Sequence, residues 1–310
     1  MNINTAFSRQ LIESAKTDKR IVVIDPEVAR STGMREFAQA HPQSFFEVGV
    51  AEQNALGISA GLAACGNLPF CVSFAPFATM RPLEMIRTSV GYTRQPVRIV
   101  GAYAAFTDGK DGATHEALED VGMLRPIPNL LIVSPSDGVM AKAIVRASLQ
   151  LEAPMYIRLE NEDCPQIYDE NFAFEIGRIY EIRKGNDVTI AAYGTATHRA
   201  LEAAKLLDDR GISAQVLDVA TLKPFDSNQF MHLLEKTGRL VILEDHVCNG
   251  GLASIAAEAV GSAGRKIQMR RLAVPDVFGL SGTPQQLREH FHLSAMDVVN
   301  AAMEMMNCEG

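Results

Sequence analysis

The segment FFEVGVAEQNALGISAGLA, Phe45 to Ala63, decides the fold class. Its first residues have the apolar, β-rich composition of a buried strand, and the rest have the spacing of an apolar helix punctuated by glycine. Glu52 falls at the first turn of that helix, directly after the strand. Because a strand that leads at once into a helix is the building unit of parallel sheets, the segment predicts an α/β fold.

The same alternation continues along the whole chain. The first half has strand candidates at 21–25, 45–50, 70–74, 97–102, 130–133 and 155–159, and the second half has them at 187–193, 213–219, 239–245 and 266–274. Helical patterns separate these runs, and the helix expected after 133 starts with Ser136 and Asp137, both favourable N-cap residues. We therefore expect mainly parallel sheets with helices on their faces.

A polar stretch in the middle of the chain divides it into two domains. Residues 161–177 contain a proline and show weak periodicity, which is typical of a linker. The 310 residues suffice for two domains with separate cores. We expect a mainly parallel-sheet domain over 1–165, a linker over 166–182 and a smaller α/β domain over 183–310.

The composition argues against several classes of function. Lys and Arg number 29 against 37 Asp and Glu, and the resulting net charge of -8 offers no footprint for nucleic acid or an anionic membrane. The N-terminus lacks the pattern of a secretory signal, and no apolar run is long enough to span a bilayer. Five scattered cysteines without a C-x-x-C pair argue against a disulfide framework or a zinc site. We expect a cytoplasmic protein that binds no metal through its own side chains.

Glu52 has a structural and a functional interpretation. An acidic residue near a helix N-terminus stabilises the helix dipole and needs no other role. Here, however, Val48 and Val50 are among several small or apolar neighbours, so we expect the carboxylate to face a dry site. A carboxylate in such surroundings suits a group that exchanges a proton with a ligand.

Two further segments supply candidate ligand groups. Phe74 and Phe77 follow a strand, where loops build the ligand sites of open α/β sheets. They form either ordinary core or a flat apolar slot for a planar heterocycle. In FTDGKDGATHEALED, glycine-bearing turns precede Asp111 and His115, which are four positions apart and could converge on one small polar molecule.

In this order the motifs resemble the pyrimidine-binding domain of the transketolase family. The run is G-V-A-E-Q-N, then S-F-x-x-F, then D-G-x-T-H-x-x-x-E-D, and finally RPIPNLLIVSPSD. In the second half, TLKPFD, LEDHVCNGGLAS and DVFGLSGTPQQLREHF resemble the C-terminal domain of the same family. The resemblance therefore extends over essentially the whole chain.

That resemblance implies a cofactor and roles for individual residues. In the family, a glutamate at the position of Glu52 hydrogen-bonds N1′ of the aminopyrimidine of thiamine diphosphate and so helps to activate the cofactor. Phe77 matches the aromatic residue that stacks on the pyrimidine, and Phe74 matches another wall of that pocket. His115 and Asp111 match residues that contact the hydroxyl groups of the donor and acceptor sugars.

The expected binding of a sugar phosphate departs from the family pattern. Many members carry an arginine after the strand matched by MYIRL, where this chain has Glu160 and Asn161. Loss of a guanidinium removes a bidentate phosphate ligand. Arg158 and Arg9, which falls near a family arginine, are the remaining candidates for substrate binding. Either the substrate is not an ordinary terminal sugar phosphate, or another group binds the phosphate.

Two other positions on the expected substrate side differ as well. Tyr103 stands where many transketolases have a histidine that faces the substrate, and we count it as a substrate-binding residue. Met80 stands where some members have an aromatic residue. The sequence leaves open the central pentose phosphate route and a catabolic route for an unusual pentose, a branched sugar or a sulfonated sugar, and the altered arginine position favours the latter.

The resemblance also implies a second subunit. Full-length members begin with a domain that binds a metal ion and the diphosphate through a G-D-G motif, and no G-D-G occurs here. Mg²⁺ or Ca²⁺ and the diphosphate are therefore expected on a partner chain. The implied enzyme is a split transketolase, a dimer of heterodimers that transfers a two-carbon ketol unit from a ketose to an aldose.

Other classes remain open. The β subunit of a 2-oxo acid dehydrogenase shares the domain order, although its loop usually resembles G-P-x-H-S, and deoxyxylulose phosphate synthase is normally one long chain. A non-catalytic regulatory partner of a transketolase would not need the glutamate and the aromatic slot, and both are retained. A nucleotide-binding protein would need a G-x-G-x-x-G turn between a strand and a helix, and none is present.

Overall fold

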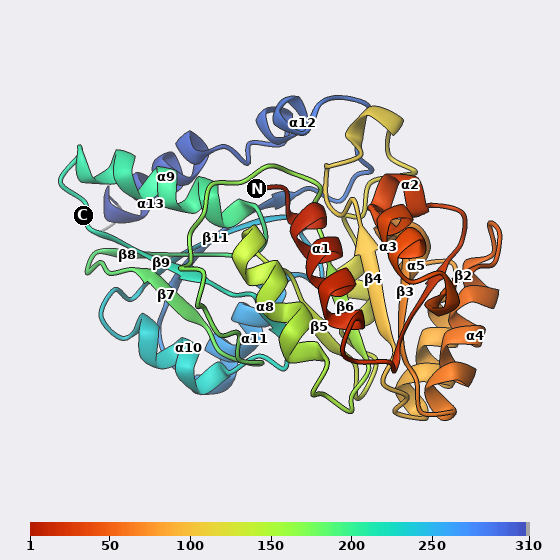
Figure 1. Ribbon diagram of the computed structural model, residues 1–310. Coiled ribbons are helices and arrows are strands. Elements are labelled where there is room, and N and C mark those ends of the chain that lie inside the picture. The colour runs from red at the N-terminus through yellow and green to blue at the C-terminus, as the bar shows by residue number, and fades with distance from the viewer. Residues whose placement is uncertain (308–310) are drawn as a thin grey trace.

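Two β-sheets organise the chain into two α/β lobes that lie side by side (Figure 1). The computed structural model describes residues 1–307. Both sheets are mainly parallel, and each carries an antiparallel strand at one edge. None of the helices within residues 1–307 combines the length and the hydropathy that crossing a bilayer requires. The architecture confirms the fold class that the sequence predicts.

The first sheet has seven strands. They are β1 (Ile21–Asp25), β2 (Phe45–Glu47), β3 (Leu68–Phe74), β4 (Arg98–Ala102), β5 (Leu131–Val133), β6 (Met155–Arg158) and β10 (Thr221–Lys223), in the spatial order β10-β5-β6-β4-β3-β1-β2. Strands β1, β4 and β6 are buried at every position. Helices on both faces of a parallel sheet explain why these strands read as continuous apolar runs.

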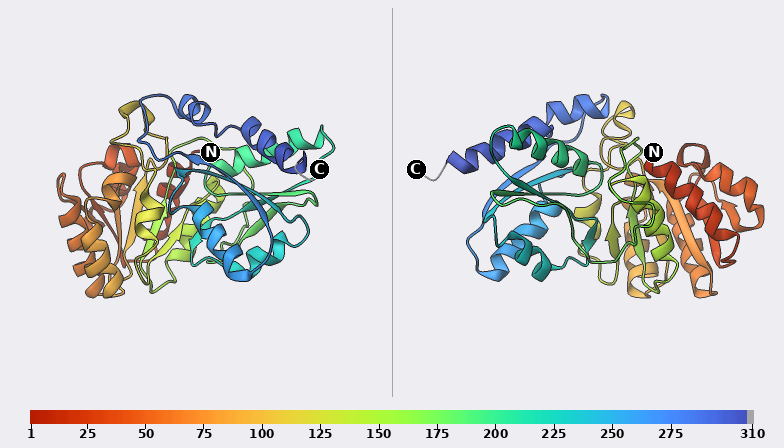
Figure 2. Two further views of the ribbon diagram at one scale, coloured as in Figure 1. Left: turned by 180° about the vertical axis from the view of Figure 1, so that it is seen from behind. Right: turned by 60° about the vertical axis from the view of Figure 1, so that its left-hand side comes forward.

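Helices cover both faces of this sheet. α1 (Ile3–Ala15) and α8 (Gly138–Ser148) pack against each other on one face, and α4 (Glu52–Ala64) lies on the other (Figures 1 and 2). The predicted N-cap Asp137 is confirmed, because its side chain accepts a hydrogen bond from the backbone N–H of Met140. Shorter helices fill the connections: α2 (Ala29–Thr32), α3 (Met34–Ala40), η1 (Pro42–Ser44), α5 (Ala75–Thr79), α6 (Leu83–Met85), η2 (Ile86–Tyr92), η3 (Gly109–Asp111) and α7 (Asp120–Leu124).

The second sheet has five strands in the order β12-β11-β8-β9-β7. They are β7 (Tyr180–Arg183), β8 (Val188–Ala192), β9 (Ala214–Asp218), β11 (Arg239–Val247) and β12 (Gln268–Val274). Helices α9 (Ala196–Asp208) and α13 (Ala295–Asn307) pack together on one face, and α10 (Ser227–Leu234) packs with α11 (Leu252–Ala263) on the other (Figure 2). Helix α12 (Pro284–His290) follows the long connection that leaves β12.

Two short antiparallel strands, β7 and β10, are missing from the sequence-based prediction. β7 begins inside the stretch expected to be a linker and pairs with β9. β10 comes from the second half of the chain but pairs with β5 of the first sheet, with Thr221 opposite Val133. Three or four residues carry too little periodicity to reveal a strand whose partner is distant in the sequence. The second half of the chain thereby completes the sheet of the first.

Candidate active site

The carboxyl ends of the strands around β1 form the candidate site. β1 has β2 on one side and β3 on the other, so the order of strand addition reverses here. Open α/β sheets bind ligands in the crevice outside such a switch point. The connections that leave β2, β3 and β4 at this edge carry five of the predicted site residues: Glu52, Phe74, Phe77, Tyr103 and His115.

A sharp turn after β2 places Glu52 at the start of α4. Gly49 has φ 71°, a left-handed conformation that glycine adopts without strain, and the strand predicted over 45–50 already ends at Glu47. Glu52 is the first residue of α4, and its side chain is 7% exposed. Nη1 of Arg81 donates a hydrogen bond to Oε1 of Glu52 across 2.7 Å. A carboxylate at a helix N-terminus is also favoured by the helix dipole.

Four aromatic rings gather at the same edge. The ring centroid of Phe74 lies 5.2 Å from that of Tyr103 and 6.0 Å from that of Phe77. His115 lies 5.1 Å from Phe77 and 6.2 Å from Phe74. All four pairs meet edge to face, a favourable geometry for aromatic rings. The guanidinium carbon of Arg81 lies 4.1 Å from the Phe77 centroid and thereby joins this ring group to Glu52.

An unusual backbone holds the loop after β4. Tyr103 and Ala105 have φ 56° and 58°, in the left-handed region, which costs a residue with a side chain about 1–2 kcal/mol. The Tyr103 hydroxyl donates to the carbonyl oxygen of Ser31 across 3.1 Å, and the Ala105 N–H donates to the carbonyl oxygen of Ala117 across 3.2 Å. Burial, with a smaller contribution from the Asp108 charge, raises the pKa of Tyr103. Strained positions of this kind collect at ligand sites.

Two aspartates accompany His115 in this region. Asp111 ends η3 with an exposed side chain. Burial and the charge of Asp111 raise the pKa of Asp108, while His115 opposes that rise. Nδ1 of His115 lies 3.1 Å from Oγ1 of Thr114. Asp108 is thus close enough to Asp111 and His115 for their charges to act on it. The sequence analysis did not name it, although its T-D-G turn stands next to K-D-G.

The two predicted arginines have opposite surroundings. Arg9 lies on the exposed side of α1. Arg158 is fully buried: Nε donates to Asp120, Nη1 donates to Glu160, and Nη2 donates to two backbone carbonyls. The expectation that Arg158 faces a substrate overlooked that β6 is a central strand covered on both faces, so that alternate positions are all interior.

The rim of the site is open and apolar. Phe46, Val50 and Met80 are 41%, 69% and 38% exposed. The expected dry surroundings of Glu52 therefore do not extend to Val50, although the Glu52 side chain itself is buried. Exposed apolar side chains beside a buried carboxylate are typical of a surface that binds another molecule.

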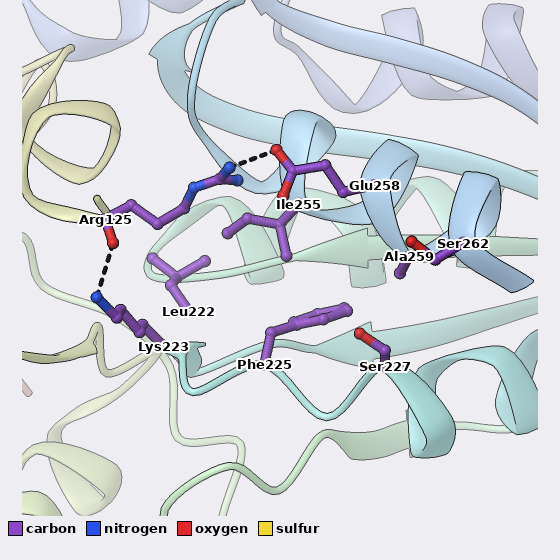
Figure 3. A pocket seen from close by; sticks show the side chains of 9 residues that line it. All are labelled: Arg125, Leu222, Lys223, Phe225, Ser227, Ile255, Glu258, Ala259 and Ser262. Atoms are coloured by element: carbon purple, nitrogen blue, oxygen red, sulfur yellow. Dashed lines mark hydrogen bonds and ion pairs between the residues drawn. The ribbon is translucent and has the colours of Figure 1, made fainter. Parts of the chain in front are cut away.

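A cavity of about 430 Å³ lies at the contact between the lobes and contains none of the predicted site residues (Figure 3). Nζ of Lys223 donates to the carbonyl oxygen of Arg125 across 2.7 Å, and the Arg125 guanidinium pairs with Glu258. Burial, with a smaller effect of the Arg125 charge, lowers the pKa of Lys223. Both cations have protein partners, so we interpret this cavity as part of the seam between the lobes.

The position of Arg81 indicates what kind of group Glu52 and Phe77 can accept. The guanidinium is planar, lies over the Phe77 ring and directs an N–H group at Glu52. The aminopyrimidine of thiamine diphosphate is also planar and has nitrogen atoms along its edge, so these two residues would fit it. Within residues 1–307, no cluster of three or more His, Cys, Asp or Glu side chains could hold a metal ion.

Comparison with protein families identifies both halves of the chain. The transketolase pyrimidine binding domain matches residues 1–166, and the transketolase C-terminal domain matches residues 177–298. The first domain is therefore of the pyrimidine-binding type found in thiamine-dependent enzymes. The chain belongs to the transketolase family.

Individual relatives refine this assignment. The chain is 39% identical over 295 residues to the 6-deoxy-6-sulfo-D-fructose transketolase subunit of a Clostridium species. The aligned region covers 95% of this chain and 91% of that protein. It is 34% identical over 305 residues to the 1-deoxy-D-xylulose-5-phosphate synthase of Heliobacterium modesticaldum, but spans only 47% of that enzyme. A solved structure described as a split gene transketolase, inactive beta4 tetramer, superposes with a TM-score of 0.89 at 38% identity and covers 98% of this chain and 97% of that chain. These comparisons confirm the predicted type, the C-terminal half of a split transketolase.

Proposed function

We propose that this chain binds the pyrimidine end of thiamine diphosphate in a two-subunit transketolase that transfers a two-carbon ketol unit from a ketose to an aldose. The observation that carries the proposal is the arrangement of Glu52, Phe77 and His115 at one edge of the sheet: the Arg81 guanidinium joins Glu52 to Phe77, and the His115 ring packs against Phe77. A partner chain supplies the diphosphate and metal site. The active unit is a dimer of heterodimers.

Each site residue has a defined task in this proposal. When bound, thiamine diphosphate supplies the nucleophile that cleaves the ketose. Glu52 shares a proton with N1′ of the pyrimidine, and the 7% exposure of its side chain keeps water from competing for that proton. Phe77 offers its ring face, and Phe74 closes the pocket beside it. His115 and Asp111 orient the sugar hydroxyl groups.

The open rim supports the need for a second subunit. Phe46, Val50 and Met80 would leave apolar surface in water if the chain worked alone. The solved relative is described as an inactive tetramer of its own kind of chain. We infer that this chain, too, self-associates without activity and becomes active when the diphosphate-binding subunit covers the rim.

The substrate is a ketose whose terminal group, far from the carbonyl, is not bound by an arginine that follows β6. Arg158 is held inside the protein, and Glu160 accepts hydrogen bonds from Arg158 and from the backbone N–H of Thr195. Neither side chain is free to bind phosphate. The Clostridium relative is named for a sulfonated fructose, which supports a specialised sugar rather than a common pentose phosphate.

The proposal is tested by reconstitution. The chain is co-expressed with the diphosphate-binding subunit, and two-carbon transfer is measured with thiamine diphosphate and Mg²⁺ for the mixture and for each subunit alone. We expect activity in the mixture only, and a loss of at least about 100-fold in Glu52→Gln because the amide cannot take up the shared proton. Glu36→Gln, an exposed position on α3, is the matched control and should retain activity.

Two outcomes would contradict this assignment. Turnover by the isolated chain would show that it carries a complete site. A mixture that is inert on ketoses but consumes pyruvate or another 2-oxo acid would assign the chain to the synthase or dehydrogenase type, an alternative that the similarity to 1-deoxy-D-xylulose-5-phosphate synthase keeps open.

A further inference from the structure

Arg81 touches both groups that the cofactor pyrimidine requires. Its Nη1 is 2.7 Å from Oε1 of Glu52, and its guanidinium carbon is 4.1 Å from the centroid of Phe77. Its carbonyl oxygen accepts a hydrogen bond from Nε2 of Gln53 across 3.2 Å, which fixes the backbone beside α4. The side chain itself is 47% exposed, whereas that of Glu52 is 7% exposed.

We propose that Arg81 is an exchangeable stand-in for the pyrimidine: its guanidinium occupies the space between Glu52 and Phe77 in the free chain and leaves when the cofactor ring enters. The inference rests on the proposed function, because it assigns the pyrimidine to these two residues. It adds a residue that neither the family motif nor the sequence analysis singled out. Arg81 is a positioning residue, since it acts through Glu52 and Phe77.

Physical chemistry explains both the occupancy and the exchange. A carboxylate that is almost fully buried is unfavourable without a donor, and the planar guanidinium supplies a charge-assisted hydrogen bond while covering an aromatic face. The same contact contributes little net free energy because about half of the arginine side chain is in water. Water screens the ion pair and hydrates the guanidinium when the pair breaks. A contact of this kind supplies the buried carboxylate with a donor in the absence of the cofactor and yields to a ligand that offers the same donor.

The exchange has a measurable consequence for cofactor affinity. Binding must break the contact between Arg81 and Glu52, so removing the guanidinium should make binding tighter. An exposed ion pair corresponds to a change in affinity of about two- to fivefold. Arg81→Gln should therefore lower the Kd for thiamine diphosphate by about that factor, and Arg81→Lys should give an intermediate value because it retains the charge without the flat stack.

Arg87→Gln is the matched control. Arg87 lies in η2, six positions along the chain, and is exposed. The Arg87→Gln variant loses the same charge as Arg81→Gln. It therefore corrects for any long-range effect of a cation on the anionic diphosphate. Isothermal titration of thiamine diphosphate into the assembled two-subunit complex should give a tighter Kd for Arg81→Gln and an unchanged or weaker Kd for Arg87→Gln. An unchanged or weaker Kd for Arg81→Gln overturns the proposal.

The isolated chain gives a second readout that needs no cofactor. A double-mutant cycle with Glu52→Gln and Arg81→Gln, measured by urea unfolding, should show a favourable coupling between the two residues. In the complex saturated with thiamine diphosphate, that coupling should vanish. Absence of coupling in the free chain overturns the role of Arg81, whereas failure of the wild-type complex to bind thiamine diphosphate overturns the proposed function itself.

Discussion

Two arginine–carboxylate contacts of similar length have opposite roles in this protein. Nε of Arg158 is 2.9 Å from Asp120, and both side chains are 0% exposed. Nη1 of Arg81 is 2.7 Å from Glu52, but the arginine is 47% exposed. The distances alone do not separate the two pairs. Burial does, because a buried charge without its partner has no water to replace it, whereas an exposed one is hydrated at once.

The buried pair belongs to a network that joins the lobes. Arg158 also donates to Glu160 across 2.8 Å and to the backbone carbonyl oxygen of Asp245 across 3.0 Å. Glu160 in turn accepts from the backbone N–H of Thr195 across 3.2 Å. Asp245 and Thr195 lie in the second lobe, so the charges of β6 fix the position of one sheet against the other. The exposed pair touches only the site edge of the first lobe.

The largest effect is expected from removing the buried guanidinium. Arg158→Met leaves Asp120 and Glu160 without their charged partner in the interior, and should lower the free energy of unfolding by about 3–5 kcal/mol. Urea unfolding of the full chain measures this value. A loss below about 1 kcal/mol would mean that the network does not hold the lobes together.

A much smaller loss of stability is expected at the contact between Arg81 and Glu52. Arg81→Gln should lower the free energy of unfolding by less than about 1 kcal/mol, because Arg81 is 47% exposed and the glutamine amide can still donate a hydrogen bond to the buried Glu52. Equal losses in Arg81→Gln and Arg158→Met would remove the distinction between an exchangeable and a structural pair.

A smaller effect is expected at the hydroxyl that supports the buried network. The Tyr156 hydroxyl donates to Oδ2 of Asp120 across 2.6 Å, and both residues are fully buried. Tyr156→Phe should cost about 1–2 kcal/mol, since it removes one charge-assisted hydrogen bond and leaves the ion pair in place. Tyr92→Phe, at an exposed position, is the control and should have no measurable effect. A cost at Tyr156 as large as that of Arg158→Met would show that the hydroxyl, rather than the guanidinium, is the critical partner of Asp120.

An effect that depends on pH concerns a buried carboxylate with no arginine partner. Glu116 is 2% exposed, neither of its oxygens has a hydrogen-bond partner, and a Cβ on Gly279 of the second lobe would lie 1.4 Å from Oε2. Burial and then the Glu119 charge raise the pKa of Glu116 to about 7. The folded state therefore holds its proton more tightly than the unfolded state, so this stability is present below about pH 4.5 and is lost as the pH rises through about 7.

Glu116→Gln stays neutral at every pH and should remove that dependence. The variant should be more stable than the wild type at pH 8, by about 1 kcal/mol, and the gain should shrink towards pH 4.5. Thermal unfolding at both pH values measures it, with Glu36→Gln as an exposed control. A gain that does not vary with pH would exclude ionisation of Glu116 as its cause.

The fold was largely predictable because its signals are local. The strands β1, β3 and β4 are mainly apolar runs, and α8 begins directly after Asp137, a residue type that commonly caps helices. β10 was not predictable, because only three residues form it and its partner β5 lies about ninety positions earlier. No local pattern shows that a segment of the second half belongs to the sheet of the first.

The candidate site was predictable in part for the same reason. Phe74 ends β3, and Phe77 and Glu52 lie within five positions of the ends of β3 and β2, so the sequence alone puts them at the carboxyl edge of the sheet. Arg81 was missed because its partner is 29 positions away. Arg158 was placed wrongly because β6 is covered on both faces. In such a strand the side chains on both faces are buried, so neither face leads to a substrate.

The sequence by itself determined the alternation of most strands and helices, the edge of the sheet at which Glu52, Phe74 and Phe77 lie, and the family to which the motifs belong. The tertiary structure alone decided which charges meet and how much water reaches them: Arg158 inside the seam, Arg81 on the open face over Phe77. The physical reason is that the backbone pattern depends on neighbouring residues, whereas the strength of an ion pair depends on the distance and burial created by segments far apart in the chain.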